Sequence, residues 1–117
     1  MGKLTTHILD TAHGKPGAGV GIDLYRRHAD ARERLASFVT NADGRCDTPL
    51  LEGGALLAGT YELDFHIGDY FAALGLALPQ PRFVDVVTLR FGIADAHAHY
   101  HVPLLASPYS YSTYRGS

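Results

Sequence analysis

The segment 61–67, Tyr-Glu-Leu-Asp-Phe-His-Ile, alternates apolar and polar side chains at every position. Successive side chains of a β-strand point to opposite faces of a sheet, so this period of two predicts a strand with one face against a core. The same alternation recurs at 20–25, 86–93 and 98–105, and more weakly at 4–10, 35–40 and 110–114. The sequence therefore predicts seven or eight short strands.

Residues that favour turns separate these segments. Glycine, proline, asparagine and aspartate gather at 13–17, 41–44, 52–54 and 79–81. One segment breaks the alternation: Asp69 is placed to cap a short helix and Gly75 to end it, with Tyr70, Phe71 and Leu74 on one side. Many short strands with one short helix predict an all-β fold, an antiparallel β-sandwich.

The composition fits a single domain spanning residues 1–117. A chain of this length can bury one modest core without metal or disulfide staples. Hydrophobic residues make up 46% and charged residues 19% of it, a globular balance rather than a disordered one. The formal net charge of −2 gives no basic surface for nucleic acid, and the apolar runs are too short to span a membrane. We therefore expect neither kind of partner.

Two features bear on the cellular compartment. The segment from Met1 to His7 contains no apolar stretch followed by a cleavage site, so no signal peptide is expected. Cys46 is the only cysteine, so no disulfide can form within the chain and a reducing compartment is acceptable. We expect a cytoplasmic protein, or a periplasmic one if a leader has been removed.

The seven histidines are unevenly placed along the chain. His97, His99 and His101 occupy alternate positions of one expected strand, so all three project from the face opposite its apolar residues. His7 likewise lies opposite the apolar positions of the segment 4–10. From spacing alone, the simplest interpretation is a set of solvated histidines on an exposed sheet face. The ordinary acid–base role of histidine near neutral pH stays open beside it.

Three chemical interpretations compete with that of solvated surface histidines. Three histidines on one face could bind zinc or copper if another ligand joined them, but Asp95 is the only close acid and no cysteine is near, so no metal is expected. A nucleophile has little support: no Gly-x-Ser-x-Gly is present, and although Arg45 could lower the thiol pKa of Cys46, a lone cysteine is usually a small packing residue. The third is attack by water: an imidazole with a pKa of about 6.5 can deprotonate it near neutral pH. Arg45 and Arg115 are then candidates to stabilise the oxyanion.

Three motifs, in order along the chain, resemble the transthyretin-like family. The first is 4–11, Leu-Thr-Thr-His-Ile-Leu-Asp-Thr, with Gly17 after it, and the second is 40–45, Thr-Asn-Ala-Asp-Gly-Arg. The third is 99–105, His-Tyr-His-Val-Pro-Leu-Leu, followed by Ser-Pro-Tyr-Ser-Tyr-Ser-Thr-Tyr-Arg-Gly-Ser at 107–117. The similarity covers essentially the whole chain. It implies a sandwich of two four-stranded sheets with one short helix.

Within that family, a thyroid-hormone carrier and a hydrolase branch share the fold but differ at the site. The hydrolase pattern has histidines at the positions of His7 and His101, arginine at Arg45, and a terminal Tyr-Arg-Gly-Ser that matches 114–117. The carrier lacks these four elements. The resemblance therefore implies the hydrolase branch, which in urate degradation opens the ring amide of 5-hydroxyisourate to 2-oxo-4-hydroxy-4-carboxy-5-ureidoimidazoline without a cofactor.

The resemblance also implies roles for single residues. His7 and His101 would hold and deprotonate the attacking water, and Arg45 would bind the carbonyl oxygens of the substrate and offset developing negative charge. Tyr114 would donate a hydrogen bond near the ring, and Ser117 would close the site with its hydroxyl or terminal carboxylate.

Three further residues would support that site. His99 would belong to its surroundings, Arg115 would hold the tail by pairing with a carboxylate, and Gly116 would let the backbone approach closely. His97 falls outside the motif and is expected to be solvated.

Finally, the resemblance implies a homotetramer, a dimer of dimers joined sheet edge to sheet edge, with the sites at the dimer–dimer interface. Two alternatives stay open: a carrier without turnover, and a metal-binding periplasmic module using the histidines of 97–101.

Overall fold

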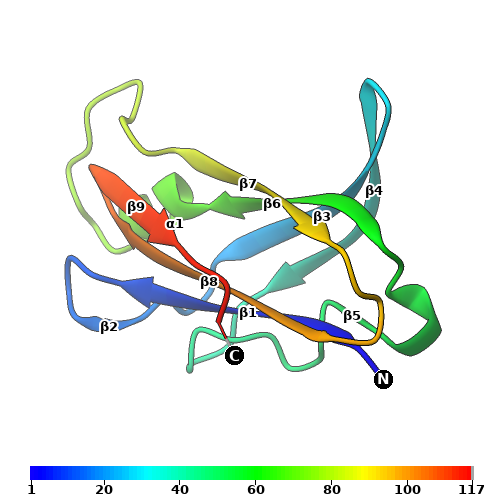
Figure 1. The fold of residues 1–117 in the computed structure, drawn as a ribbon. Coiled ribbons are helices and arrows are strands. Elements are labelled where there is room, and N and C mark those ends of the chain that lie inside the picture. Colours follow the sequence, from blue (N-terminus) through cyan, green and yellow to red (C-terminus); the bar gives the residue numbers. More distant parts are fainter. Residues whose placement is uncertain (117) are drawn as a thin grey trace.

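The computed structural model describes residues 1–116, which form two β-sheets packed one over the other (Figure 1). One sheet has the strand order β4-β3-β6-β7, and the other has the order β2-β1-β8-β9 with β5 paired to β1. The strands are β1 (Lys3–Asp10), β2 (Lys15–Pro16), β3 (Gly21–His28), β4 (Ala31–Val39), β5 (Leu51–Glu52), β6 (Gly59–His66), β7 (Val86–Ile93), β8 (His99–Ser107) and β9 (Ser110–Thr113). The helices are α1 (Ile67–Ala73) and the short 3-10 helix η1 (Gly53–Ala55).

The expected sandwich with one short α-helix is confirmed, with two differences in the sheets. The first is the two-residue strands β2 and β5, which give the sheet containing β1 five strands instead of four. The second is the pairing of β1 with β8, which is parallel, with Leu4 opposite Tyr100. No hairpin connects these two strands, since all strands of the other sheet come between them in the chain, so the local sequence does not fix their relative direction.

The alternation of apolar residues places the core between the sheets, as predicted. Tyr61, Leu63 and Phe65 of β6 are at most 1% exposed, and the corresponding positions in the other strands, with Val20 just before β3, pack against them. These are Leu4, Ile8, Val20, Ile22, Leu24, Val87, Leu89, Ile93, Tyr100, Val102 and Leu104.

The helix begins earlier than the sequence predicts. α1 starts at Ile67, directly after β6, and His66 is its N-cap residue, without a side-chain capping hydrogen bond. Asp69 is therefore not the cap; it lies in the first turn and its carboxylate accepts a hydrogen bond from Arg82 at 2.7 Å. The end is as predicted, because Gly75 follows the last turn with a φ of 87°, a backbone conformation that favours glycine. Within the described residues, no helix has the length and apolarity that a membrane span needs.

One buried carboxylate joins α1 to the end of β1. Asp10 is 1% exposed. Its Oδ2 accepts hydrogen bonds from the hydroxyl of Tyr70 and from Nδ1 of His13, each at 2.7 Å. Burial raises the pKa of Asp10, but these hydrogen bonds outweigh that effect and lower it overall. Tyr70 and Phe71 are buried as expected, whereas Leu74 is 42% exposed because the helix has already ended there.

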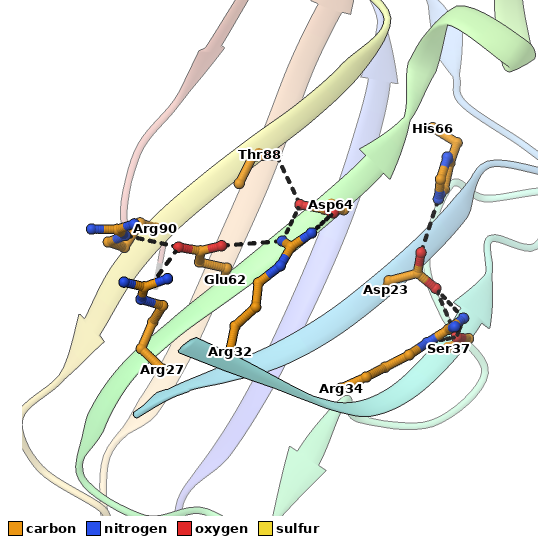
Figure 2. Close-up of polar contacts among 10 residues, drawn as sticks. All are labelled: Asp23, Arg27, Arg32, Arg34, Ser37, Glu62, Asp64, His66, Thr88 and Arg90. Carbon is orange, nitrogen blue, oxygen red and sulfur yellow. Dashed lines mark hydrogen bonds and ion pairs between the residues drawn. The ribbon is translucent and has the colours of Figure 1, made fainter. Parts of the chain in front are cut away.

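The outer face of the four-stranded sheet carries a charge network that the alternation did not reveal (Figure 2). Glu62 and Asp64 point away from the core, yet they are only 4% and 7% exposed. Arg32 of β4 contacts both carboxylates, each at 3.1 Å, and Arg90 of β7 donates to Glu62 at 2.8 Å. β4 begins at Ala31, four residues before its predicted start at Leu35, because its charged first residues have partners: Arg32 is held by acids of β6 and Arg34 by Asp23 of β3.

Candidate active site

The outer face of the other sheet brings His7 and His101 together. In the parallel register of β1 and β8, Thr5 lies opposite His101 and His7 lies opposite Pro103. Because alternate residues share a face, His7, Thr5 and His101 all point away from the core. Both histidines are partly buried, whereas His99, two residues before His101, is exposed.

The turn after β4 places Arg45 beside His7. Oδ1 of Asn41 accepts hydrogen bonds from the backbone N–H groups of Asp43, at 2.9 Å, and Arg45, at 3.2 Å. A side-chain oxygen that accepts from following N–H groups closes the turn on itself. The turn then docks on β1, where Arg45 and His7 form an isolated antiparallel bridge.

Gly44 makes this docking possible. Its carbonyl accepts a hydrogen bond from the N–H of Ile8 at 2.8 Å. It has a φ of 74°, and a Cβ at this position would lie 2.4 Å from the carbonyl oxygen of Ile8. Both the backbone conformation and the close approach therefore require glycine. Arg45 reaches the histidine face because the residue before it has no side chain.

Burial and positive charge favour the neutral form of both histidines. Partial burial lowers the pKa of His7, and the guanidinium of Arg45 lowers it further, against a smaller opposite effect of a hydrogen bond to the backbone of Asp43. Burial is also the largest cause of the lowered pKa of His101, followed by the charges of Arg45, His7 and His99. Both imidazoles are therefore poised to accept a proton at neutral pH, next to a permanent cation.

The hydroxyl of Thr5 joins two of the histidines, a contact that the sequence reasoning missed. Oγ1 of Thr5 lies 2.8 Å from Nδ1 of His101 and 3.0 Å from Nε2 of His99. With Nδ1 of His101 engaged, its Nε2 is the nitrogen left for water or substrate. Thr5 was recognised only as part of the first motif, because the register that places it opposite His101 joins two strands distant in sequence.

An open hollow lies beside this cluster. It has a volume of about 150 Å³ and is lined by Thr5, Thr6 and the segment 45–49. Cys46 lies on its wall, partly buried. Burial and the charge of Asp47 raise the pKa of its thiol, so the suggested lowering of this pKa by Arg45 is wrong.

The tail after β9 returns to the same cluster. The N–H of Gly116 donates to the carbonyl of His101 at 2.8 Å. Arg115 places its guanidinium 4.1 Å from the ring centre of Tyr100 and donates to the carbonyl of His99 at 3.2 Å. Within residues 1–116, Arg115 thus holds the tail through a ring and a backbone carbonyl, and the expected pairing with a carboxylate is not formed among these residues.

One expected site residue, Tyr114, is not brought to the histidines within this single chain. Tyr114 is 61% exposed and lies on the wall of a separate cleft of about 320 Å³ between β7 and the β8–β9 pair. Its proposed hydrogen bond to substrate stays a prediction. Ser117 lies outside the described residues.

His97 does not share the face of His99 and His101. It lies in the turn before β8, where its N–H donates to the Asp95 carboxylate at 2.8 Å. The three-histidine pattern behind the metal interpretation is therefore not formed. Among residues 1–116, no three histidine, cysteine or acidic side chains are grouped so that they could hold a metal ion.

Together, the fold and the cluster define a transthyretin-like β-sandwich with two histidines and an arginine on an outer sheet face. The chain belongs to the HIUase/Transthyretin family, whose model matches residues 4–116. It is 63% identical to the 5-hydroxyisourate hydrolase of Ralstonia nicotianae over the full length of both chains.

Solved structures agree with this assignment. Klebsiella pneumoniae 5-hydroxyisourate hydrolase is 38% identical with a TM-score of 0.81, and all of both chains is covered. Sea bream transthyretin in complex with thyroxine is 30% identical with a TM-score of 0.86, covering 97% of this chain and 94% of its own.

Proposed function

We propose that this protein hydrolyses 5-hydroxyisourate to 2-oxo-4-hydroxy-4-carboxy-5-ureidoimidazoline. Water adds to the carbonyl carbon of the ring amide, giving a tetrahedral oxyanion. The carbon–nitrogen bond then breaks, the nitrogen takes up a proton, and the former carbonyl carbon becomes a carboxylate. The reaction consumes only the substrate and water, so no cofactor is part of the proposal.

The observation that carries the proposal is the convergence of His7, His101 and Arg45 on one outer sheet face. Neutral imidazoles can take a proton from water, and the pKa of both histidines is lowered. Among the described residues, the guanidinium of Arg45 makes no side-chain hydrogen bond or ion pair. It is therefore available for the oxygens of the substrate and for the charge that develops on the oxyanion.

Each residue then has a role. His7 and His101 hold the water and take its proton, and Arg45 orients the carbonyl oxygens. Tyr114, which lies away from the histidines of its own chain, donates a hydrogen bond near the ring of a substrate bound at a neighbouring subunit, and Ser117 closes the site. Arg115 and Gly116 hold the tail beside β8.

The direct test follows the absorbance of freshly generated 5-hydroxyisourate with and without the protein. Because the substrate also decays unaided, the rate must rise in proportion to protein concentration. The variant Arg45→Gln, which removes the exposed cation without touching the core, is the matched control and should lose most of the acceleration. A wild-type protein that binds the substrate without accelerating its decay would favour the carrier-like alternative and end the proposal.

The assembly that we propose is a homotetramer, a dimer of dimers. β7 and β9 each end a sheet, and within the described residues neither has a second neighbour, so both present unpaired backbone groups to a partner. On the histidine face, Leu9 and Leu105 lie opposite each other in register and are only partly buried. Edge pairing would form the dimers, and this face would meet the second dimer.

Assembly is tested with Leu105→Glu, which places a charge on the histidine face away from the catalytic groups. We expect smaller particles by light scattering, unchanged β-sheet circular dichroism, and strongly reduced turnover. A fully active monomer at assay concentration would show that the site does not need the interface.

A further inference from the structure

Thr5 lies between two histidines that differ in their exposure. His101 is partly buried beside Arg45, whereas His99 is exposed on the same face. The distances from Oγ1 of Thr5, 2.8 Å to Nδ1 of His101 and 3.0 Å to Nε2 of His99, are both hydrogen-bond distances. The three side chains form one continuous chain of hydrogen bonds from the site to solvent.

A hydroxyl has a single proton, so it can donate to only one of the two rings at a time. If it donates to Nε2 of His99, then Nδ1 of His101 carries a proton and donates to the hydroxyl, and Nε2 of His101 has a free lone pair. If it donates to His101, the tautomer of His101 is reversed and Nε2 carries the proton. Thr5 therefore couples the tautomers of the two rings.

We propose that Thr5 is a positioning and relay residue that passes the proton taken from water by His101 to His99, which holds it while the tetrahedral intermediate exists. This inference rests on the proposed function, because it concerns the proton that the hydrolysis releases. It goes beyond that function by giving Thr5 and His99 defined parts in it.

The proton balance is complete within the three residues. Nε2 of His101 accepts a proton from water, its Nδ1 proton moves to Oγ1 of Thr5, and the original hydroxyl proton moves to Nε2 of His99. His101 is then neutral with its proton on Nε2, and His99 is an imidazolium. The reverse sequence lets Nε2 of His101 donate to the leaving ring nitrogen, which restores all three groups.

The charges around the chain favour this transfer. A cation on His101 would be partly buried and would face Arg45 from the turn and His7 from β1, the groups that lower its pKa. On the single chain the same charge on His99 is exposed to water, and His99 begins β8 whereas Leu105 lies near its other end, so a dimer contact centred on Leu9 and Leu105 would leave His99 at the hydrated rim. Lys3 of β1 lies opposite His99 in register, and Arg115 of the tail contacts the carbonyl of His99, so neither ring faces an acidic group in these contacts. His99 therefore carries the positive charge more favourably than His101 because it is hydrated, and not because a counter-ion is near.

The first test removes the hydroxyl while keeping the shape of the side chain. Thr5→Val should lower kcat about 10- to 100-fold, the order of magnitude that follows loss of the hydrogen-bond partner of a metal-ligating histidine, with KM changed less than twofold. Thr5→Ser, which retains the hydroxyl, should recover most of the rate. The control is Thr11→Val, which removes a hydroxyl that bonds the carbonyl of Ala106 on the same strand pair and should leave kcat unchanged. A Thr5→Val enzyme with wild-type kcat would overturn the proposal.

The second test concerns His99. His99→Ala should lose activity to a similar extent, and added imidazole, at constant pH and ionic strength, should restore part of it by supplying a new proton acceptor beside Thr5. Pyrrole, which has the same shape but no basic nitrogen, should not. A loss that imidazole does not relieve would assign His99 a structural part only and would reject the relay.

A third measurement needs no turnover and separates the relay from the proposed function. The ¹⁵N shifts of His101 at neutral pH should report a proton on Nδ1 in the wild type and a shift toward Nε2–H in Thr5→Val. An unchanged tautomer would show that Thr5 does not control His101, even in an active enzyme. The expected tautomer change in a protein that does not hydrolyse 5-hydroxyisourate would keep the coupling and reject the function instead.

Discussion

Replacing Gly116 by alanine should disturb the candidate active site through a single methyl group. Gly116 lies beside His101, to whose carbonyl its N–H donates. A Cβ at residue 116 would lie 2.7 Å from Cδ2 of the His101 ring and 3.3 Å from its Cβ and Cγ. Gly116 is not among the residues with positive φ, so alanine can adopt its backbone conformation. The whole effect therefore comes from contact with the imidazole.

The size of the effect follows from these distances. Carbon atoms pack at about 3.5–4.0 Å, so the ring or the tail must move by roughly 1 Å. A displacement of about 1 Å at a reacting group costs about 100-fold in rate, so kcat should fall between about 10- and 100-fold. The free energy of unfolding should change little. Weakening the hydrogen bond from residue 116 to the carbonyl of His101 would cost about 1 kcal/mol, and alanine offsets a similar amount by lowering the conformational entropy of the unfolded chain.

The assay compares kcat and the thermal midpoint of Gly116→Ala with those of Gly54→Ala. Gly54 is exposed and also lacks a positive φ, and a methyl group added there would have no atom within 4 Å, so this variant controls for the substitution itself. We expect the two variants to melt alike and only Gly116→Ala to lose activity. Equal activity of both would show that the approach of the tail to His101 has no part in catalysis.

Three further predictions concern the histidines, the arginine and the charge network. His7→Asn and His101→Asn should each lower kcat about 10²- to 10⁴-fold, and the double variant should lose much less than the product of the two effects, since both act on one water. Activity should rise with pH as the histidines become neutral, with an acid limb below their ordinary pKa of 6.5, and Arg45→Gln should move this limb to higher pH; identical profiles would contradict the contribution of Arg45. Glu62→Gln should lower the free energy of unfolding by only about 1 kcal/mol in urea titrations, because Glu62 is buried but the side chains of Arg32 and Arg90 are 36% and 59% exposed and stay hydrated, while the activity of the folded protein stays constant; a loss several times larger would show that the network behaves as a buried one.

The parts of the fold that follow from local patterns could be predicted from the sequence. The alternation in 61–67 places Tyr61, Leu63 and Phe65 in the core, and Gly75 ends α1 where expected. The start of β4 and the N-terminus of α1 could not be predicted in this way. Both depend on partners distant in sequence, since Arg32 is held by acids of β6 and the N–H of Gly68 is bonded to the carbonyl of Asp85.

The candidate site, too, could be predicted only in part from the sequence. The motifs identify His7, His101 and Arg45, and the strand period predicts that both histidines leave the core. Their proximity depends on the parallel register of β1 and β8 and on the docking of the turn that contains Gly44, which no local pattern encodes. His97 illustrates the limit: the spacing of two places it on the strand, but β8 begins only at His99.

The charged groups are paired within the chain on one outer sheet face but not on the other, and this difference indicates which face is functional. On the face shown in Figure 2, the buried carboxylates of Glu62 and Asp64 are matched by arginines of the same chain, an arrangement complete in one subunit. On the other face, Arg45 lies beside two partly buried imidazoles with lowered pKa values, and the adjacent Leu9 and Leu105 are only partly covered. An arginine without an acidic partner next to neutral imidazoles contributes little to stability, but it can bind the carbonyl oxygens of a polar substrate. Partial burial by the same chain strengthens these interactions, and covering the face with a second dimer would strengthen them further by excluding water. Catalysis and assembly are therefore expected to depend on the same surface.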